Sequence, residues 1–403
     1  MKEASEKDIL IGRRNALKMV GLGAGAMLAA GFNSCALGPE RTVEKMFPRV
    51  NIKPIFKDKI SPVAFTTGTD RVHMINEVMK PFLSELKAAI KNKKIVLKIN
   101  MVVSNTYLCA THKDAIRGVL EFLKPIYKGE ILIAESTSNG DATVGFENYG
   151  YLDLANEYNV KFYDIDIEDK IGNPCYVLNS NLFLEEIALA KVLTDPDYFV
   201  INVSRMKTHN AVVMTGNIKN LAMGSPIRNG VVGADGRAFN SKRIVHNGAN
   251  PRVVHYNLFA VNHMSRPDFS VIDAVETMEG NGPIGGTPVD HKVALAGFDG
   301  VAVDSMCTRL MGIPMEQVGY LNYCAAAGMG NVDRDKIEII GSQVPENHII
   351  QYAMNPNIES QLKWMDVPFM HAPRGYQIVP APTPPPGTPG AFGFGAPPTP
   401  QPR

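Results

Sequence analysis

Short apolar segments of strand length alternate with segments of helical spacing through the middle of the chain. Residues 95–100, 131–134 and 198–203 are nearly continuous apolar runs, and residues 113–123 repeat apolar side chains every three or four positions. Continuous apolar strands are buried on both faces, and helices between parallel strands provide that cover. The sequence therefore predicts an α/β fold, a mostly parallel sheet with helices on both faces. Further strands are expected at 160–163, 269–272 and 293–296, and a further helix at 300–311.

Composition places the chain among ordinary globular proteins. Of its 403 residues, 45% are hydrophobic and 20% are charged, which is close to the average for folded domains. The 41 Lys and Arg residues nearly equal the 40 Asp and Glu residues, so no surplus of positive charge indicates nucleic acid as a partner. Recognition must therefore depend on a local site.

Residues 1–36 resemble a twin-arginine signal peptide. Arg13 and Arg14 precede Leu17, and the Gly/Ala-rich apolar stretch at 19–32 is too short for a membrane span of about 20 residues. The twin-arginine route carries proteins that are already folded, often with a cofactor inserted. We therefore expect the protein to be exported, with the twin-arginine export machinery as a partner.

Two outcomes of export remain open at residues 34–36. Cleavage after Ala36 has small residues at Ser34 and Ala36 and releases a soluble periplasmic protein. Lipidation of Cys35 instead leaves a lipoprotein that is anchored to the membrane through this residue.

The rest of the chain divides by composition. Residues 37–60 read as a linker, 61–376 as one α/β domain, and 377–403 as a Pro/Gly-rich disordered tail. The remaining cysteines lack the paired spacing of zinc and iron–sulfur sites, so we expect buried small side chains rather than disulfides. These cysteines are Cys109, Cys175, Cys307 and Cys324.

Polar clusters follow four of the predicted strands. They lie at 135–141, at 204–210, at Asp273 with 279–286, and at 297–299 with Asp304 on the next helix. Parallel sheets bind ligands beyond the carboxyl ends of their strands, so the clusters predict one shared site at that edge. The alternative is that they are turns and helix caps.

The candidate residues of this site fall into three groups. A histidine suits proton transfer near neutral pH, lysines bind carboxylate or phosphate, and carboxylates suit Mg²⁺, Ca²⁺ or Mn²⁺. The predicted catalytic residues are Lys207, His209 and Lys219. The predicted ligand-binding or anion-binding residues are Lys98, Asn100, Asn220, His246, Gly280, Asn281 and Gly282. The predicted metal ligands are Glu135, Asp273, Glu279, Asp299 and Asp304.

Two segments add to this prediction. Residues 214–217 are expected to form a turn whose backbone N–H groups bind an anion. The irregular stretch at 225–251 is expected to be a lid or a disordered loop, in which His246, beside Lys242 and Arg243, closes the site over an anionic ligand.

The same segments resemble the family known as domain of unknown function 362 (DUF362), over residues 90 to 345. The resemblance rests on Lys98-Ile99-Asn100, Lys207-Thr208-His209, Lys219-Asn220-Leu221, Asp273, Glu279-Gly280-Asn281-Gly282-Pro283, Asp299 and Asp304, in this order. It implies a fold and a site but no reaction. Some relatives carry ferredoxin-type cysteine clusters, which this chain lacks.

Together these features predict an exported protein that binds a small anionic ligand, with or without a divalent metal. We expect an enzyme of the hydrolytic or proton-transfer type, with His209 or Lys207 as the base. Two alternatives stay open: a redox or cofactor-carrying accessory protein, and a non-catalytic ligand-binding lipoprotein.

Overall fold

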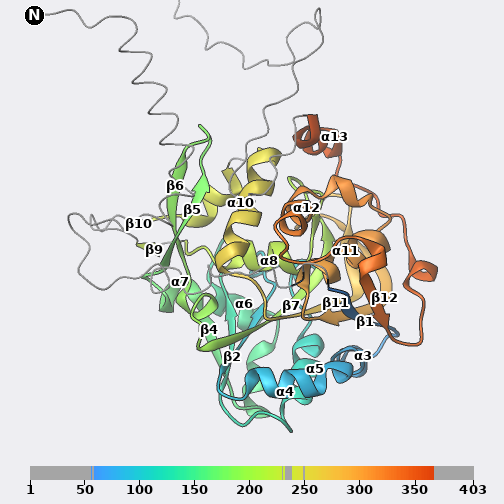
Figure 1. Ribbon diagram of the computed structural model, residues 1–403. Helices are drawn as coiled ribbons and strands as arrows, with labels where there is room; N and C mark the ends of the chain where they lie inside the picture. Colours follow the sequence, from blue (N-terminus) through green and yellow to red (C-terminus); the bar gives the residue numbers. More distant parts are fainter. Residues whose placement is uncertain (1–55, 57–58, 229, 232–237, 248–249, 367–403) are drawn as a thin grey trace, which may run out of the picture.

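The computed structural model describes residues 56, 59–228, 230–231, 238–247 and 250–366 (Figure 1). The predicted signal peptide, most of the predicted linker and the Pro-rich tail lie outside these residues. No helix in the described part of the chain is both long and apolar enough to cross a membrane.

One large mixed sheet forms the centre of the molecule. From one edge to the other its strands are β13 (Ile337–Ile340), β1 (Ser61–Thr67), β12 (Thr287–Gly297), β11 (Phe269–Glu279), β7 (Tyr198–Thr208), β2 (Lys94–Ile99), β3 (Ile131–Glu135) and β4 (Val160–Asp164). The five strands from β11 to β4 are parallel to one another. β12 is antiparallel to both β11 and β1, and β1 is parallel to β13. The predicted α/β class is confirmed, with one antiparallel strand inside the sheet.

Each predicted strand is present, but two of them continue well beyond their apolar runs. β7 was expected to end at Val203 and ends at Thr208, and β11 was expected to end at Ile272 and ends at Glu279. The added residues of β7 are all buried and, except Met206, polar, and Lys207 still lies opposite Met278 in the ladder between the two strands. Backbone pairing therefore extends these strands past the point at which hydrophobicity stops.

Helices cover both faces of the sheet (Figure 1). One face packs against α3 (Arg71–Met79), α4 (Leu83–Ile90), α5 (Lys113–Leu123) and α6 (Ala142–Asn148). The other packs against α8 (Asn217–Gly224), α10 (Pro251–Met264), α11 (Gly300–Leu310) and α12 (Gly319–Ala326). α5 has the predicted bounds and is preceded by His112, whose Nδ1 accepts the Asp114 N–H and so caps the first turn.

Smaller elements lie beside α10. β5 (Asn173–Leu178) and β6 (Leu184–Leu189) form a hairpin, and β9 (Gly230–Val231) pairs with β10 (Ala238–Phe239). The described part of the stretch 225–251, expected to be irregular, holds this short ladder and the helix α9 (Ser241–His246). The remaining elements are β8 (Met214–Thr215), which pairs with β7, and the short helices α7 (Ile165–Glu168) and α13 (Ile358–Leu362).

The cysteines of the domain behave as predicted. All four are free and buried, and they take part in the packing of the protein interior. Burial raises the pKa of Cys175 to about 12, because the thiolate would lose its water. The Cys175 thiol is therefore a neutral packing group at neutral pH.

Candidate functional site

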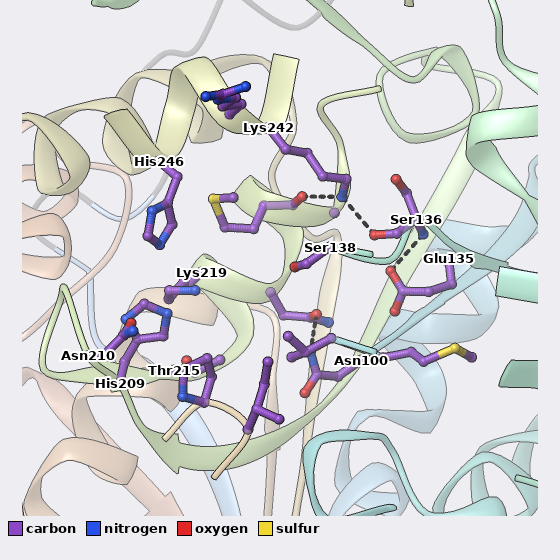
Figure 2. Close-up of a pocket in the computed structure, with 18 of the residues that line it drawn as sticks. Asn100, Glu135, Ser136, Ser138, His209, Asn210, Thr215, Lys219, Lys242 and His246 are labelled. Atoms are coloured by element: carbon purple, nitrogen blue, oxygen red, sulfur yellow. Dashed lines mark hydrogen bonds between the residues drawn. The ribbon is translucent and has the colours of Figure 1, made fainter. Parts of the chain in front are cut away.

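A cavity of about 460 Å³ lies at the carboxyl ends of β2, β3 and β7, between α8 and α9 (Figure 2). The turn that joins β11 to β12 closes one side with Pro283 and Ile284. The polar residues of the lining are Asn100, Glu135, Ser136, Ser138, His209, Asn210, Thr215, Lys219, Asn220, Asn240, Lys242, Arg243 and His246. The position agrees with the rule that open parallel sheets bind ligands beyond the ends of their strands.

A chain of buried hydrogen bonds forms the floor of the cavity, and it runs in one direction. The Lys207 ammonium donates to Asn100 Oδ1, and Asn100 Nδ2 donates to Asn220 Oδ1 at 2.8 Å. Asn220 Nδ2 donates to Asn202 Oδ1 at 2.7 Å, and Asn202 Nδ2 donates to Asn217 Oδ1 at 3.0 Å. Asn100, Asn220 and Asn202 each donate and accept in this series, so the orientation of these three amides is fixed.

The floor continues into the first turn of α8. The backbone N–H groups of Asn217 and Ile218 donate to the two carboxyl oxygens of Asp304, at 2.7 and 2.8 Å. A carboxylate at a helix N-terminus satisfies N–H groups that have no partner within the helix. The Asn217 N–H, which belongs to the predicted anion-binding turn at 214–217, therefore already has a carboxyl group of the same protein as its acceptor.

A buried ion pair forms one wall. Lys98 Nζ donates to Glu135 Oε1 at 2.6 Å, and the Ser136 N–H donates to the same oxygen at 2.7 Å. Burial raises the pKa of Glu135 and lowers that of Lys98, since both charged forms lose water, and their mutual attraction opposes both shifts. Glu135 Oε2 is buried without a partner among the described residues. The positive charge of Lys98 therefore offsets the negative charge of Glu135.

Lys219 is a nearly buried cation of the cavity. It lies on α8 with 7% of its surface exposed, and its ammonium makes no hydrogen bond or ion pair within the described part of the chain. Burial, together with the positive charges of Lys207 and Lys242, lowers its pKa to about 7. Close to neutral pH the group is therefore divided between ammonium and amine.

Two histidine rings flank Lys219, and their centroids are 5.9 Å apart (Figure 2). His209 Nδ1 accepts the Ala211 N–H at 2.9 Å, so the neutral ring carries its proton on Nε2. Burial, reinforced by Lys219, lowers the pKa of His209 well below its usual value and that of His246 to about 4. Both rings are neutral at physiological pH, and His209 offers an N–H donor.

α9 supplies two further cations. Lys242 Nζ donates to the Ser136 carbonyl at 2.6 Å and to the Met223 carbonyl, and burial lowers its pKa to about 8. Arg243 lines the outer part of the cavity from an exposed position. The cavity therefore holds Lys219, Lys242 and Arg243 against one carboxylate, which Lys98 already neutralises.

Lys207, predicted to be catalytic, does not line the cavity. Its side chain is fully buried, and besides Asn100 it donates to the Cys109 carbonyl at 3.1 Å. Lys207 was expected to follow the end of its strand, but β7 continues past Val203, so Lys207 lies inside the sheet rather than beyond its end. It positions Asn100 beneath the cavity.

The predicted metal ligands do not come together. β12 is antiparallel, so its carboxyl end lies beside the start of β11, where Gly297 pairs with Ser270. Asp299 is consequently at the far edge, where it caps α11 by accepting from Val301 and Ala302, both at 3.0 Å. This is the helix cap that the sequence left open as the alternative.

The other carboxylates are also engaged elsewhere. Asp273 lies within β11 and is paired with Arg71 at 3.2 Å, while Glu279 accepts the Ala353 N–H at 2.8 Å. Asp304 caps α8, and only Glu135 reaches the cavity. Among the described residues, no three His, Cys, Asp or Glu side chains are grouped as they are around a metal ion.

The glycine-rich turn at 279–286, which joins β11 to β12, holds one wall of the cavity in place. Thr208 Oγ1 donates to the Gly280 carbonyl at 3.1 Å, and Asn281 Oδ1 accepts from Asn355 at 3.2 Å. Gly280, Asn281 and Gly282 were predicted to bind the ligand, but the lining begins at Pro283. The turn therefore holds the Pro283–Ile284 wall against the end of β7.

Several residues of the cavity were not named individually as site residues. Thr215, from the segment 214–217 that was expected to bind an anion, lines the cavity with a buried hydroxyl that has no partner in the described structure, and Ser136 and Ser138 come from the predicted cluster after β3. Asn202, in the floor, lies inside an apolar run that predicts only a strand. Lys242 was indicated by its proximity to His246 alone.

Fold and cavity together define an α/β protein with a cationic pocket at the carboxyl edge of its sheet. The family model for the domain of unknown function DUF362 matches residues 95–309, and the chain belongs to this family. The match confirms the resemblance found in the sequence motifs.

Two individual proteins are similar to this one. The thylakoid-associated protein sll1697 of Synechocystis sp. is 27% identical over 222 residues, which are 54% of this chain and 63% of that protein. A crystal structure of a Thermotoga maritima protein from the Northeast Structural Genomics Consortium covers 62% of this chain and 61% of its own, with 11% identity and a TM-score of 0.39.

Proposed function

We propose that the cavity binds a small anionic ligand, and that Lys219 is the group that recognises it. The observation that carries the proposal is a nearly buried ammonium without a counter-ion or hydrogen-bond partner among the described residues. Burying an unpaired charge is costly, so such a group indicates a partner of opposite charge.

The surrounding charges support an anion rather than a cation. Lys242 donates to two carbonyl groups, which carry no full charge, and Glu135 is already paired with Lys98. Lys219 and Lys242 both face the cavity, and Arg243 stands at its outer part. The His209 Nε2–H adds a neutral donor, which suits a carboxylate or phosphate oxygen.

The size of the cavity limits the ligand to a small molecule. A volume of about 460 Å³ lies within the range of small-molecule sites in proteins. A lysine amine with a pKa of about 7 also suits proton transfer near neutral pH. The reaction class that we propose is therefore proton transfer or hydrolysis, with Lys219 in place of Lys207 as the reactive lysine.

We also propose that the protein acts outside the cytoplasm, after twin-arginine export. The support is the pair Arg13-Arg14 ahead of a short apolar stretch. The similar Synechocystis protein is named thylakoid-associated, and by analogy we propose a membrane anchor, for which Cys35 is the candidate residue. Mass spectrometry of the purified mature N-terminus separates lipidation at Cys35 from cleavage after Ala36.

Binding of small anions tests the proposed site. Acetate, lactate and inorganic phosphate are titrated into the full-length protein by calorimetry at low salt. We expect at least one to bind, and Lys219→Met to weaken binding by about 1–3 kcal/mol, the usual range for a lost charge-assisted hydrogen bond. Lys87→Met is the matched control, because Lys87 is exposed on α4 and far from the cavity. Equal losses in both variants would refute the assignment.

A further inference from the structure

We propose that the Lys219 amine forms an imine with the carbonyl group of its ligand, so that the ligands of the cavity are small oxo acids. This inference rests on the proposed anion-binding function and names the substrate class of the same site. It makes Lys219 a nucleophile rather than only a counter-ion.

The first argument is geometric. Four lysines lie in or beneath the cavity, and three of them have fixed ammonium groups: Lys98 on Glu135, Lys207 on Asn100 and Lys242 on two carbonyls. Lys219 alone of these four has a nitrogen without a hydrogen-bond acceptor in the described structure. A nucleophilic amine needs a free lone pair and space for its electrophile, and only Lys219 has both.

The second argument concerns the charge of the nitrogen. An amine attacks a carbonyl carbon only in its neutral form. Burial and the neighbouring cations Lys207 and Lys242 keep the pKa of Lys219 at about 7, so a large fraction is neutral at physiological pH. Desolvation and an adjacent positive charge are the recognised means of activating a lysine for imine formation.

The third argument concerns the oxygen of the electrophile. His209 Nδ1 is occupied by the Ala211 N–H, so the ring presents Nε2–H as a donor beside Lys219 (Figure 2). Such a donor polarises a carbonyl group and stabilises the oxygen as charge develops on it. Lys242, with two of its three N–H groups engaged, keeps one for the acid group of the ligand.

The chemical step balances without an oxidant or reductant. The nitrogen lone pair forms the C–N bond while the C=O π pair moves to oxygen, which takes up a proton. The nitrogen then releases a proton, and the oxygen leaves as water after a second protonation. The neutral amine, the oxo acid and one proton give the protonated imine and one water molecule.

Reductive trapping tests the inference on the full-length protein. Pyruvate and sodium cyanoborohydride convert any imine to a stable secondary amine, and peptide mapping by mass spectrometry then locates it. We expect Lys219 to be modified at least tenfold faster than Lys87, which serves as the exposed reference in the same sample. Because the unsubstituted protein provides this readout, the test does not depend on the folding of a variant.

Lactate provides the matched ligand, since it has the same charge and nearly the same size as pyruvate but no carbonyl group. We expect lactate to slow trapping at Lys219 and to leave Lys87 unaffected. If calorimetry shows that lactate and pyruvate bind but Lys219 is not selectively trapped, the imine is refuted and the anion site stands. If no anion binds and no selective trapping occurs, both proposals fail.

Discussion

Lys207 and Lys219 show how differently two lysines from neighbouring motifs can be placed. Both side chains are largely buried, but Lys207 has two hydrogen-bond acceptors, whereas the Lys219 ammonium has none in the described structure. Sequence alone gives them equal standing, because the acceptor atoms of Lys207 come from positions about a hundred residues earlier. The tertiary structure, and not the local sequence, therefore determines which of the two lysines is available for a ligand.

Anion affinity should depend on pH through Lys219. Its pKa of about 7 in the free protein will rise when an anion binds, because the anion favours the ammonium form. Binding then takes up a proton, so affinity is highest below pH 7 and falls by up to about tenfold per pH unit above it, until the pKa of the complex is reached. Calorimetry in buffers of different ionisation enthalpy measures both the affinity and the proton uptake.

The variant Lys219→Met is the control for this pH dependence. Burial lowers the pKa of His246 to about 4 and that of His209 well below its usual value, so neither ring changes charge between pH 6 and pH 9. Lys242, with a pKa of about 8, leaves a decline at higher pH in the variant. An unchanged profile around pH 7 in Lys219→Met would contradict the assignment.

At the scale of elements, the β11–β12 hairpin decides the shape of the cavity. A Cβ atom at Gly282 would collide with the Thr208 carbonyl oxygen, so Gly282→Ala must push the turn away from the end of β7. We expect a loss of about 1–3 kcal/mol in unfolding free energy, which is typical of overpacking, together with weaker ligand binding as the Pro283–Ile284 wall moves. Denaturant unfolding and calorimetry measure the two effects.

Gly280→Asn provides the comparison within the same turn. Gly280 has φ +71°, a value that Asn tolerates, and a Cβ atom there would meet nothing within 4 Å. We expect this variant to cost no more than about 1 kcal/mol and to keep its affinity. If Gly280→Asn impaired binding as strongly as Gly282→Ala, contact with Thr208 would not be the cause.

The sequence predicted the presence of the helices and strands better than it predicted their ends or the directions of the strands. The strands at 95–100, 131–134 and 160–163 and the helix at 113–123 were found at nearly their true positions, because apolar periodicity records burial. The direction of β12 has no such signature, since an apolar strand is equally buried in either direction. Because β12 runs antiparallel to β11, Asp299 lies at the opposite edge of the sheet from the cavity.

At the scale of the whole molecule, the export prediction concerns residues outside the described structure. Replacing Arg13 and Arg14 by lysines should leave the full-length protein in the cytoplasm, because the paired arginines are the feature on which the signal assignment rests. Cell fractionation followed by immunoblotting measures the distribution. Lys7→Arg, which leaves the pair intact, serves as the control, and normal processing of the double variant would show that the signal was misread.

The first described strand, β1, pairs with the last, β13, and this pairing affects how the chain folds during its synthesis. β1 lies between β12 and β13, so Ser61 meets its neighbour Ile337 only after most of the domain has been synthesised. Sheets assembled from such distant segments fold slowly, because the entropy of closing the loops is lost before the contacts form. We expect the nascent chain to spend a long interval with an incomplete sheet, during which unpaired strand edges invite aggregation. Export through the proposed twin-arginine pathway, which carries folded proteins, would let that interval pass in the cytoplasm.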